Sequence, residues 1–432
     1  MNKEIFKNFY NSLSRLISCP SVEGKPQKNA PFGKGVRDAL DVTLDIAKSL
    51  GYSTIDHNGY CGVAEVGEGE PFAILGHVDV VPISGEWYTP PFTLTTLDDV
   101  MYGRGVSDDK GPLLACMYAT RQLLDEGYIP SRRIRFIIGC NEESGWKCID
   151  HFNEVDSMPL EGFTPDGSFP VVYCEKGICQ LTLHFPAPVG ISHVDGGKRA
   201  NMVADECVCT LSRPSAYGSI EGVEISSDRL TLSARGKSSH GAHPELGDNA
   251  IVKMLGALSK LYPDYYLPIY NALKDIYASG IGLAGEDDSG KCTLCVGQIS
   301  LSNTLDITID IRYPAITYTI GKCIDTLRDT FGVDVVGEYR DQPPLYVPKD
   351  TPLVKSLLQA YNKVTGLNAK PIAIGGGTYA RALERGVAFG GEFSDYDTHM
   401  HEPNERMPIS VLEKMYDIYY EGIKNTCFYP LD

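Results

Sequence analysis

The chain has 432 residues, 43% of them hydrophobic, which is enough for about two or three domains with sizeable cores. Its formal net charge is -17, from 56 acidic and 39 basic residues. Because nucleic acids and anionic membranes are bound by clustered Lys and Arg, the sequence predicts neither kind of partner. The N-terminal stretch "MNKEIFKNFYNSLSRLIS" is interrupted by charges, so we expect a helix there and neither a signal peptide nor a membrane span.

Thirteen cysteines are scattered along the chain. An odd number without regular spacing is typical of a reducing cytoplasm and not of a disulfide framework. Cys292 and Cys295 in "CTLC" resemble half of a zinc ribbon, but no second pair accompanies them. We expect these two thiols to be small buried hydrophobic groups.

Apolar strands alternate with amphipathic helices in the N-terminal part of the chain. We expect helices over 35–51 and 110–127, each ending at a glycine, and buried strands over 71–77 and 133–139. This alternation predicts an α/β domain with a mainly parallel sheet and helices on both faces.

The pattern changes at about residue 179 to alternating strands, with two helices between them, which is typical of an α+β domain. The expected strands and helices are 179–185, 229–236, 304–314, 248–262 and 318–330. Three prolines then precede a capped amphipathic helix that ends near Gly366. We therefore predict a first domain of residues 1–178 and 346–432, interrupted by an inserted domain of residues 179–345.

Polar residues follow the first buried strand in "AILGHVDVVP", where His77 and Asp79 are two positions apart. Alternation places both side chains on the same side of the extended chain, so the carboxylate can hold the imidazole with its other nitrogen toward a metal. A hydrogen-bonded pair at a strand end is the alternative for this motif taken alone.

Three more stretches carry carboxylates. Asp108 and Asp109 lie in "GRGVSDDKGP" before a helix, where N-capping explains one of them and not the other. Glu142 and Glu143 in "NEESG" follow the strand at 133–139. Asp166 lies in "TPDGSFP", where an ordinary turn aspartate is the alternative.

Ligands of open α/β sheets bind beyond the carboxyl ends of the strands, which is where His77, Glu142 and Glu143 are expected. Converging acidic groups without a basic cluster need a multivalent cation, and a site of His with Asp and Glu oxygens suits zinc, manganese or cobalt. Two cations that share a carboxylate would use about five ligands and hold a water as the nucleophile. The adjacent glutamates would then divide into one metal ligand and one general base.

Six motifs in this order resemble the cocatalytic metallopeptidases of the aminoacylase and carboxypeptidase G clan (family M20), and most closely the PepV-like bacterial dipeptidases. They are "GHVDVVP", "GRGVSDDKGP", "NEESG", "TPDGSFP", "GKSSHGAHPE" and "HMHEPNE". The resemblance spans nearly the whole chain. It implies a dipeptidase with two divalent metal ions, zinc first among them, and an inserted lid domain.

The resemblance implies five metal ligands. His77 and Asp166 would hold one ion, Glu143 and His401 the other, and Asp108 would bridge both. The family's pattern of a histidine, two residues and then Asn-Glu or Asp-Glu selects His401 over the neighbouring histidine at position 399.

Three further roles follow from the same resemblance. Glu142 would be the general base, and Asp79 would orient His77. A cis peptide bond would join Asp108 to the next residue. In "SSHGAHP", the family's lid histidine precedes Gly or Ala, which selects His240 over His243 as the donor that stabilises the tetrahedral oxyanion.

The lid positions Arg312 and Asn201 resemble those that bind substrate in PepV-like enzymes. Arg312 would pair with the free carboxylate of a dipeptide, because a planar guanidinium matches both oxygens. A solvated strand-end charge is the alternative for Arg312, and a turn residue is the alternative for Asn201. The enlarged lid of this group implies a monomer.

Two other functions remain open. An N-acyl-amino-acid deacylase of the same clan is the first, although related deacylases commonly have Met-Lys-Gly where this chain has "DDKGP" and a shorter lid. The second is a metal- or peptide-binding protein without catalysis, which would be expected to have lost a ligand or the base; all six residues are present.

Overall fold

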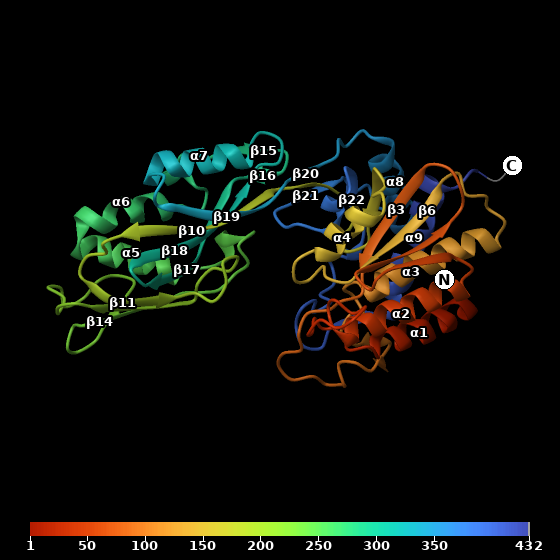
Figure 1. Ribbon diagram of the computed structural model, residues 1–432, viewed down its shortest axis with the longest axis horizontal. Helices are drawn as coiled ribbons and strands as arrows, with labels where there is room; N and C mark the ends of the chain where they lie inside the picture. The colour runs from red at the N-terminus through yellow and green to blue at the C-terminus, as the bar shows by residue number, and fades with distance from the viewer. Residues whose placement is uncertain (431–432) are drawn as a thin grey trace. The chain divides into compact units, whose positions relative to one another are not determined.

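The computed structural model describes residues 1–430, and the chain forms two compact units (Figure 1). Unit 1 comprises residues 1–173 and 347–372 together with the residues from Thr378 onward. Unit 2 comprises residues 174–346 and 373–377. Unit 2 therefore interrupts unit 1 in the sequence, and it begins five residues before the expected boundary at 179.

Unit 1 is built on a mixed sheet in the order β1-β2-β6-β3-β7-β22-β9, and the short strands β20 and β21 both pair with β9 at its end. Its strands are β1 Ser53–His57, β2 Cys61–Val66, β3 Pro71–His77, β6 Arg133–Gly139, β7 Glu161–Thr164, β22 Arg385–Ala388 and β9 Val172–Glu175, whose last residues belong to unit 2. The central strands β6, β3, β7 and β22 are parallel, while β1, β2 and β9 pair in antiparallel fashion. The expected α/β class is confirmed.

Small sheets and turns complete the strands of unit 1. A three-stranded sheet has the order β24-β5-β4, and β8 pairs with β23 in parallel. Their bounds are β4 Thr95–Leu97, β5 Val100–Tyr102, β24 Arg406–Pro408, β8 Gly167–Ser168 and β23 Gly391–Glu392, with a short 3₁₀ turn η3 at Tyr379–Ala382.

Six helices belong to unit 1: α1 Lys3–Ile17, α2 Lys34–Ser49, α3 Lys110–Asp125, α4 Lys147–Val155, α8 Pro352–Thr365 and α9 Ile409–Cys427. α3 is buried over most of its length and contacts α1, α9 and β3. It starts one residue after Asp109, so the helix fixes the position of the "DDKGP" motif. α4 and α9 are not among the helices expected from the sequence.

Unit 2 is an α+β unit with an eight-stranded antiparallel sheet in the order β13-β14-β12-β11-β17-β18-β10-β19. The strands are β10 Gly177–Pro186, β11 Ile191–Gly196, β12 Glu206–Leu211, β13 Glu224–Ile225, β14 Thr231–Arg235, β17 Thr293–Leu301, β18 Thr304–Tyr313 and β19 Val336–Gln342. Shorter elements are β15 Glu286–Asp287, β16 Gly290–Lys291, β20 Leu345–Tyr346, β21 Ile372–Ile374, η1 Pro244–Leu246 and η2 Ser279–Ile281.

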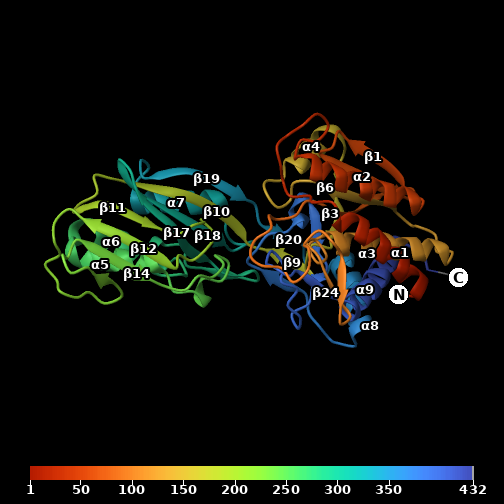
Figure 2. The ribbon, with the colours of Figure 1, turned by 90° about the horizontal axis from the view of Figure 1, so that it is seen from below.

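The helices of unit 2 are α5 Ala250–Leu261, α6 Pro263–Leu273 and α7 Ile320–Phe331. α7 packs on β10 and β19, and α6 packs on α5. α5 lies against β12 and β14 (Figure 2). The core between them is apolar, with Leu183, Ile307 and Leu258 fully buried. Alternate residues of β10 and β18 point away from this core. Gln180 and Asp310 lie directly opposite each other on that polar side and are joined by a side-chain hydrogen bond.

No helix within residues 1–430 combines the length and hydropathy that crossing a bilayer requires. All thirteen cysteines are buried free thiols. Burial raises the pKa of Cys292 and of Cys295 to about 12, so both are neutral side chains at ordinary pH. Their packing agrees with the expectation that they act as small hydrophobic groups.

Candidate active site

His77 ends the central strand β3, next to the end of β6, where its Cα is paired with that of Gly139. The side chain is fully buried. Its Nδ1 lies 3.0 Å from the main-chain oxygen of Asp79, which is an acceptor only. Nδ1 therefore carries the proton of the neutral imidazole, and the lone pair of Nε2 is available to a cation.

Asp108 lies between two histidines. Its Oδ1 is 3.0 Å from His77 Nε2, and its Oδ2 is 2.8 Å from His401 Nε2. The peptide bond from Asp108 to Asp109 is cis, as the family resemblance implies. Asp109 points elsewhere, because its Oδ2 accepts the main-chain N–H of His77 at 3.1 Å. The two carboxylates of this motif thus have different surroundings, and Asp108 is the one that faces both histidines.

Two further carboxylates complete the cluster. Asp166 Oδ2 is 3.7 Å from His77 Nε2, and Glu143 Oε2 is 3.2 Å from His401 Nε2. Two donor atoms that share one tetrahedral zinc at about 2.1 Å lie about 3.4 Å apart, so these separations fit coordination. All five predicted ligands therefore converge in unit 1, and their donor set suits a zinc, manganese or cobalt ion.

Two groups of side chains in this cluster bring their possible ligand atoms within 4.8 Å of one another. One group is His77 with Asp108 and Glu143, and the other is His77 with Asp166 and Glu142. The predicted base Glu142 is thus itself a possible ligand. A base or a ligand role for Glu142 is compatible with these distances.

The cluster carries more negative charge than its histidines balance. Burial and the carboxylate of Asp166 raise the pKa of Glu142 well above its ordinary value. Burial and Asp108 raise that of Glu143 to about 7. Burial opposes protonation of His401, yet its hydrogen bonds to Asp108 and Glu143 outweigh this and raise its pKa to about 11. Bound cations would remove this excess of negative charge.

The turn that carries the two glutamates is fixed by Asp79. Oδ1 accepts the main-chain N–H of Glu142 and Oδ2 that of Glu143, both at 3.1 Å. Oδ1 also lies 3.6 Å from His77 Nδ1, farther than the main-chain oxygen of the same residue. Asp79 therefore contacts His77 through its backbone and holds the glutamate turn through its side chain.

Two aromatic residues that the sequence analysis missed support the site. The ring of Tyr379 packs edge-on against His77, with the ring centroids 6.0 Å apart. The indole N–H of Trp146 donates to Glu142 Oε1 at 3.1 Å. Tyr379 comes from a segment more than 200 residues from the glutamates, so no local pattern could have indicated it.

The neighbouring histidines have other partners. His399 Nε2 accepts a hydrogen bond from Arg406 Nη2 at 2.8 Å, and its Nδ1 lies 3.2 Å from the carbonyl oxygen of Pro403, so both of its nitrogens have other partners. His243 is exposed and lies 3.2 Å from Glu245.

Unit 2 brings His240 and Asn201 together. Met202 and His240 form an isolated β-bridge, and the main-chain N–H of Gly241 donates to the carbonyl of Asn201 at 2.7 Å. His240 Nδ1 accepts the N–H of Ala242 at 3.2 Å, so the proton of its neutral ring is on Nε2. Burial and the charge of Arg312 lower its pKa, which favours this neutral, donating form.

Arg312 is buried and held by Asp310, so it is not a solvated strand-end charge. Its Nε and Nη2 donate to the two oxygens of Asp310 at 2.5 and 3.1 Å, and its Nη1 donates to the carbonyl of Gly375 at 3.2 Å. Gln180 Nε2 also donates to Asp310, at 2.6 Å. A guanidinium has five N–H donors, so two remain for a further acceptor.

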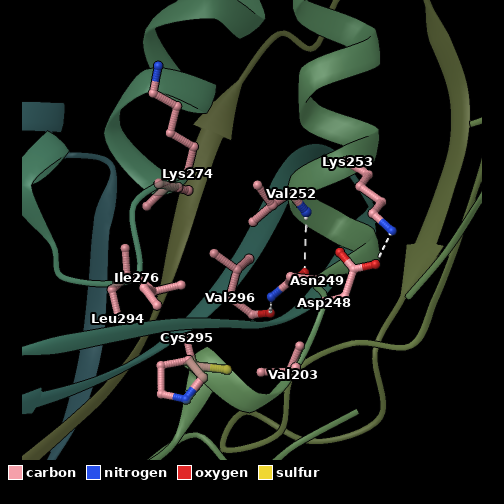
Figure 3. Close-up of a pocket in the computed structure, with 13 residues that line it drawn as sticks. Val203, Asp248, Asn249, Val252, Lys253, Lys274, Ile276, Leu294, Cys295 and Val296 are labelled. Atoms are coloured by element: carbon pink, nitrogen blue, oxygen red, sulfur yellow. Dashed lines mark hydrogen bonds and ion pairs between the residues drawn. The ribbon is translucent and has the colours of Figure 1, made fainter. Parts of the chain in front are cut away.

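Asn249 caps the start of helix α5 in unit 2 (Figure 3). The Asn249 side chain accepts the N–H groups of Ile251 and Val252 at the start of α5, and its Nδ2 donates to the carbonyl of Val296 at 2.8 Å. A cavity of about 240 Å³ lies beside this cap. None of the predicted site residues lines it.

A family model and curated relatives both match this chain over most of its length. The chain matches the family described as Peptidase family M20/M25/M40 over residues 73–425. A "putative dipeptidase" of Staphylococcus aureus is 34% identical over 455 residues, covering 96% of each chain. Another, of Staphylococcus saprophyticus, is 34% identical over 466 residues, covering 98% of each chain.

Solved structures share the fold. The M20 family metallo-carboxypeptidase Sso-CP2 from Sulfolobus solfataricus superposes with a TM-score of 0.58 at 17% identity, covering 98% of this chain and 99% of that one. The Bacillus subtilis YXEP protein, described as a dinuclear metal binding peptidase from the M20 family, gives 0.54 at 11% identity and covers 98% of each chain. At these identities the likeness is one of fold alone.

The position of Asp108 between His77 and His401 can be tested by substitution. We expect Asp108→Ala to lose both ions, because two dications a few ångströms apart need a shared anion to offset their repulsion. Elemental analysis after dialysis should find about two zinc ions per parent chain and well under one per variant chain. Asp109→Asn, which changes the adjacent carboxylate, should retain both. A variant without Asp108 that still holds two ions would place the bridge elsewhere, with Asp109 as the first residue to examine.

Proposed function

The chain belongs to the peptidase family M20/M25/M40 and is a peptide hydrolase, and we propose that it is a dipeptidase that uses two divalent cations. The observation that supports this most is the position of Asp108, with one oxygen toward His77 and the other toward His401. His77 and Asp166 would hold one cation, and His401 and Glu143 the other. Zinc is the first choice from the donor set, with manganese and cobalt as alternatives.

The cations would supply Lewis-acid polarisation of the substrate carbonyl and a lowered pKa for the attacking water. Glu142 would accept the proton of that water and deliver it to the leaving amine. His240, with its proton on Nε2, would donate to the oxyanion when unit 2 closes as a lid.

Arg312 would select dipeptides by binding their free carboxylate. A dipeptide has a free carboxylate one residue beyond the scissile bond, and Arg312 keeps donors available for it while Asp310 fixes the plane of the guanidinium. Asn201, beside His240, would supply an amide contact. A longer peptide would carry an amide where this carboxylate is required.

A panel assay separates this function from deacylation. Metal-free protein would be supplied with zinc, manganese or cobalt singly and offered dipeptides, tripeptides and N-acyl amino acids. We expect hydrolysis of dipeptides that a chelator abolishes. Faster cleavage of N-acyl amino acids would support the deacylase, and binding of cations without any hydrolysis would support a protein that only binds.

The role of Glu142 is tested by Glu142→Gln. We expect this variant to keep its cations and to lose about 100-fold or more in kcat, because proton transfer is removed while the shape of the side chain is kept. Elemental analysis and a dipeptide assay would be run on the same sample. Lost cations, or activity within about tenfold of the parent, would contradict the separation of Glu142 as base from Glu143 as ligand.

Arg312→Ala tests the recognition of the carboxylate. We expect kcat/KM for dipeptides to fall about 100-fold, equivalent to roughly 3 kcal/mol of transition-state binding, with the cations retained. The matched control is a dipeptide amide, which lacks the carboxylate and should be affected far less. Equal losses on both substrates would remove Arg312 from the site and favour the deacylase.

We also propose that the enzyme acts as a monomer in the cytoplasm. The buried thiols suit a reducing compartment, and a lid within the same chain would supply Asn201, His240 and Arg312 without a second subunit. Light scattering during gel filtration should give a mass near 47.3 kDa in the presence of zinc. A dimer whose activity falls on dilution would show that a second chain completes the site.

A further inference from the structure

Glu405 has no role in the mechanism above, yet its carboxylate accepts many hydrogen bonds from a segment that carries a predicted metal ligand. It is fully buried and accepts five hydrogen bonds, all from the segment 104–108. The donors are Arg104 Nη1 at 2.8 Å, Gly105 N at 3.0 Å, Ser107 N at 2.9 Å, Ser107 Oγ at 2.9 Å and Asp108 N at 3.2 Å.

These five contacts require a side chain that accepts hydrogen bonds and donates none. An ionised carboxylate has two acceptor oxygens and no donor, so each of these N–H and O–H groups meets an acceptor. A glutamine of the same shape would aim an NH₂ group at N–H donors. Arg104 is also fully buried and forms an ion pair with Glu405 at 2.8 Å, so the charge of Glu405 is paired within the protein. The guanidinium carbon of Arg104 lies 5.2 Å from the ring centroid of Trp87.

The five bonds join two segments that carry predicted metal ligands. Glu405 follows His401 by four residues in "HEPNE", and the segment it binds ends at Asp108. A sixth bond, from Gly103 N to the main-chain oxygen of Glu405 at 3.1 Å, ties the same two segments. The 2.8 Å approach of His401 Nε2 to Asp108 Oδ2 therefore depends on contacts that Glu405 organises.

We propose that Glu405 is a positioning residue that sets the distance between Asp108 and His401 and thereby the affinity of the metal centre. This inference rests on the proposed two-cation function. Residues that orient metal ligands typically change metal affinity about 10- to 100-fold when they are removed. Glu405 acts through Asp108, whose main-chain N–H it holds.

The chain offers a matched control in the adjacent residue. Asn404 is also buried, but its side chain holds a different segment: Oδ1 accepts the N–H of Tyr88 at 2.6 Å, and Nδ2 donates to the carbonyl of Glu86 at 3.2 Å. It makes no side-chain hydrogen bond to residues 104–108 within the described chain. Asn404→Ala should therefore lower stability without changing the distance between Asp108 and His401.

The experiment compares Glu405→Gln, Asn404→Ala and the parent by competitive zinc titration against a fluorescent chelator, with thermal unfolding of the metal-free proteins measured beside it. We expect Glu405→Gln to bind zinc at least about tenfold more weakly and to regain turnover as zinc is raised. Asn404→Ala should unfold at a lower temperature and keep parental zinc affinity. A purely structural role for Glu405 would lower the unfolding temperature alone.

A third variant keeps the test decisive if Glu405→Gln does not fold. Ser107→Ala removes one of the five hydrogen bonds and leaves every charge in place, and we expect a loss of zinc affinity of a few-fold. Parental zinc affinity in a folded Glu405→Gln variant, or in Ser107→Ala when the first variant is unfolded, would overturn the inference. A parent chain that binds fewer than two zinc ions would instead contradict the proposed function itself.

Discussion

The carboxylate of Asp108 lies between His77 and His401. The structure of unit 1 around it must hold several carboxylates close together in spite of their mutual repulsion. Glu142, Glu143 and Asp166 all lie near it, and burial and mutual repulsion raise the pKa of each. Such a cluster is costly in a buried site unless cations neutralise it. The free energy of cation binding is therefore expected to contribute to the stability of the folded unit.

Carboxylates outside the predicted ligand set hold the ligand-bearing segments in place by accepting hydrogen bonds from their main-chain N–H groups. Asp79 accepts the N–H groups of both glutamates, and Glu405 accepts those of residues 105, 107 and 108. Asp109 does the same for His77. The segments of His77, Asp108 and the two glutamates are thus held by acids outside the predicted ligand set, whereas the main-chain N–H of Asp166 donates to Thr164 Oγ1 at 3.2 Å.

Much of this site follows from sequence patterns. The strands expected at 71–77 and 133–139 agree with β3 and β6 residue for residue, because each is a continuous apolar run with polar residues at its end. Their parallel pairing places His77 beside Gly139, which explains why ligands from both motifs meet. The five predicted ligands were assigned from the resemblance of their motifs to family M20, and of these His77 and Glu143 are the ones that stand at or just after the ends of β3 and β6.

Other features had weaker signals or none. α9 could have been predicted, since Leu412, Met415, Tyr416 and Tyr419 recur at helical spacing on its buried side. α4 is short and begins after Trp146 in a left-handed conformation, without a side-chain cap to announce it. The contacts of Asp79 and Glu405 depend on the direction of backbone N–H groups in distant segments, which no spacing in the sequence encodes.

The most direct test of the account is a diffraction experiment on crystals loaded with zinc, with anomalous data collected at the zinc edge. Two peaks about 3.5–4 Å apart, with one oxygen of Asp108 bound to each, are the result that the account predicts. A single peak, or two peaks of which neither contacts Asp108, would contradict the shared carboxylate and with it the two-cation mechanism.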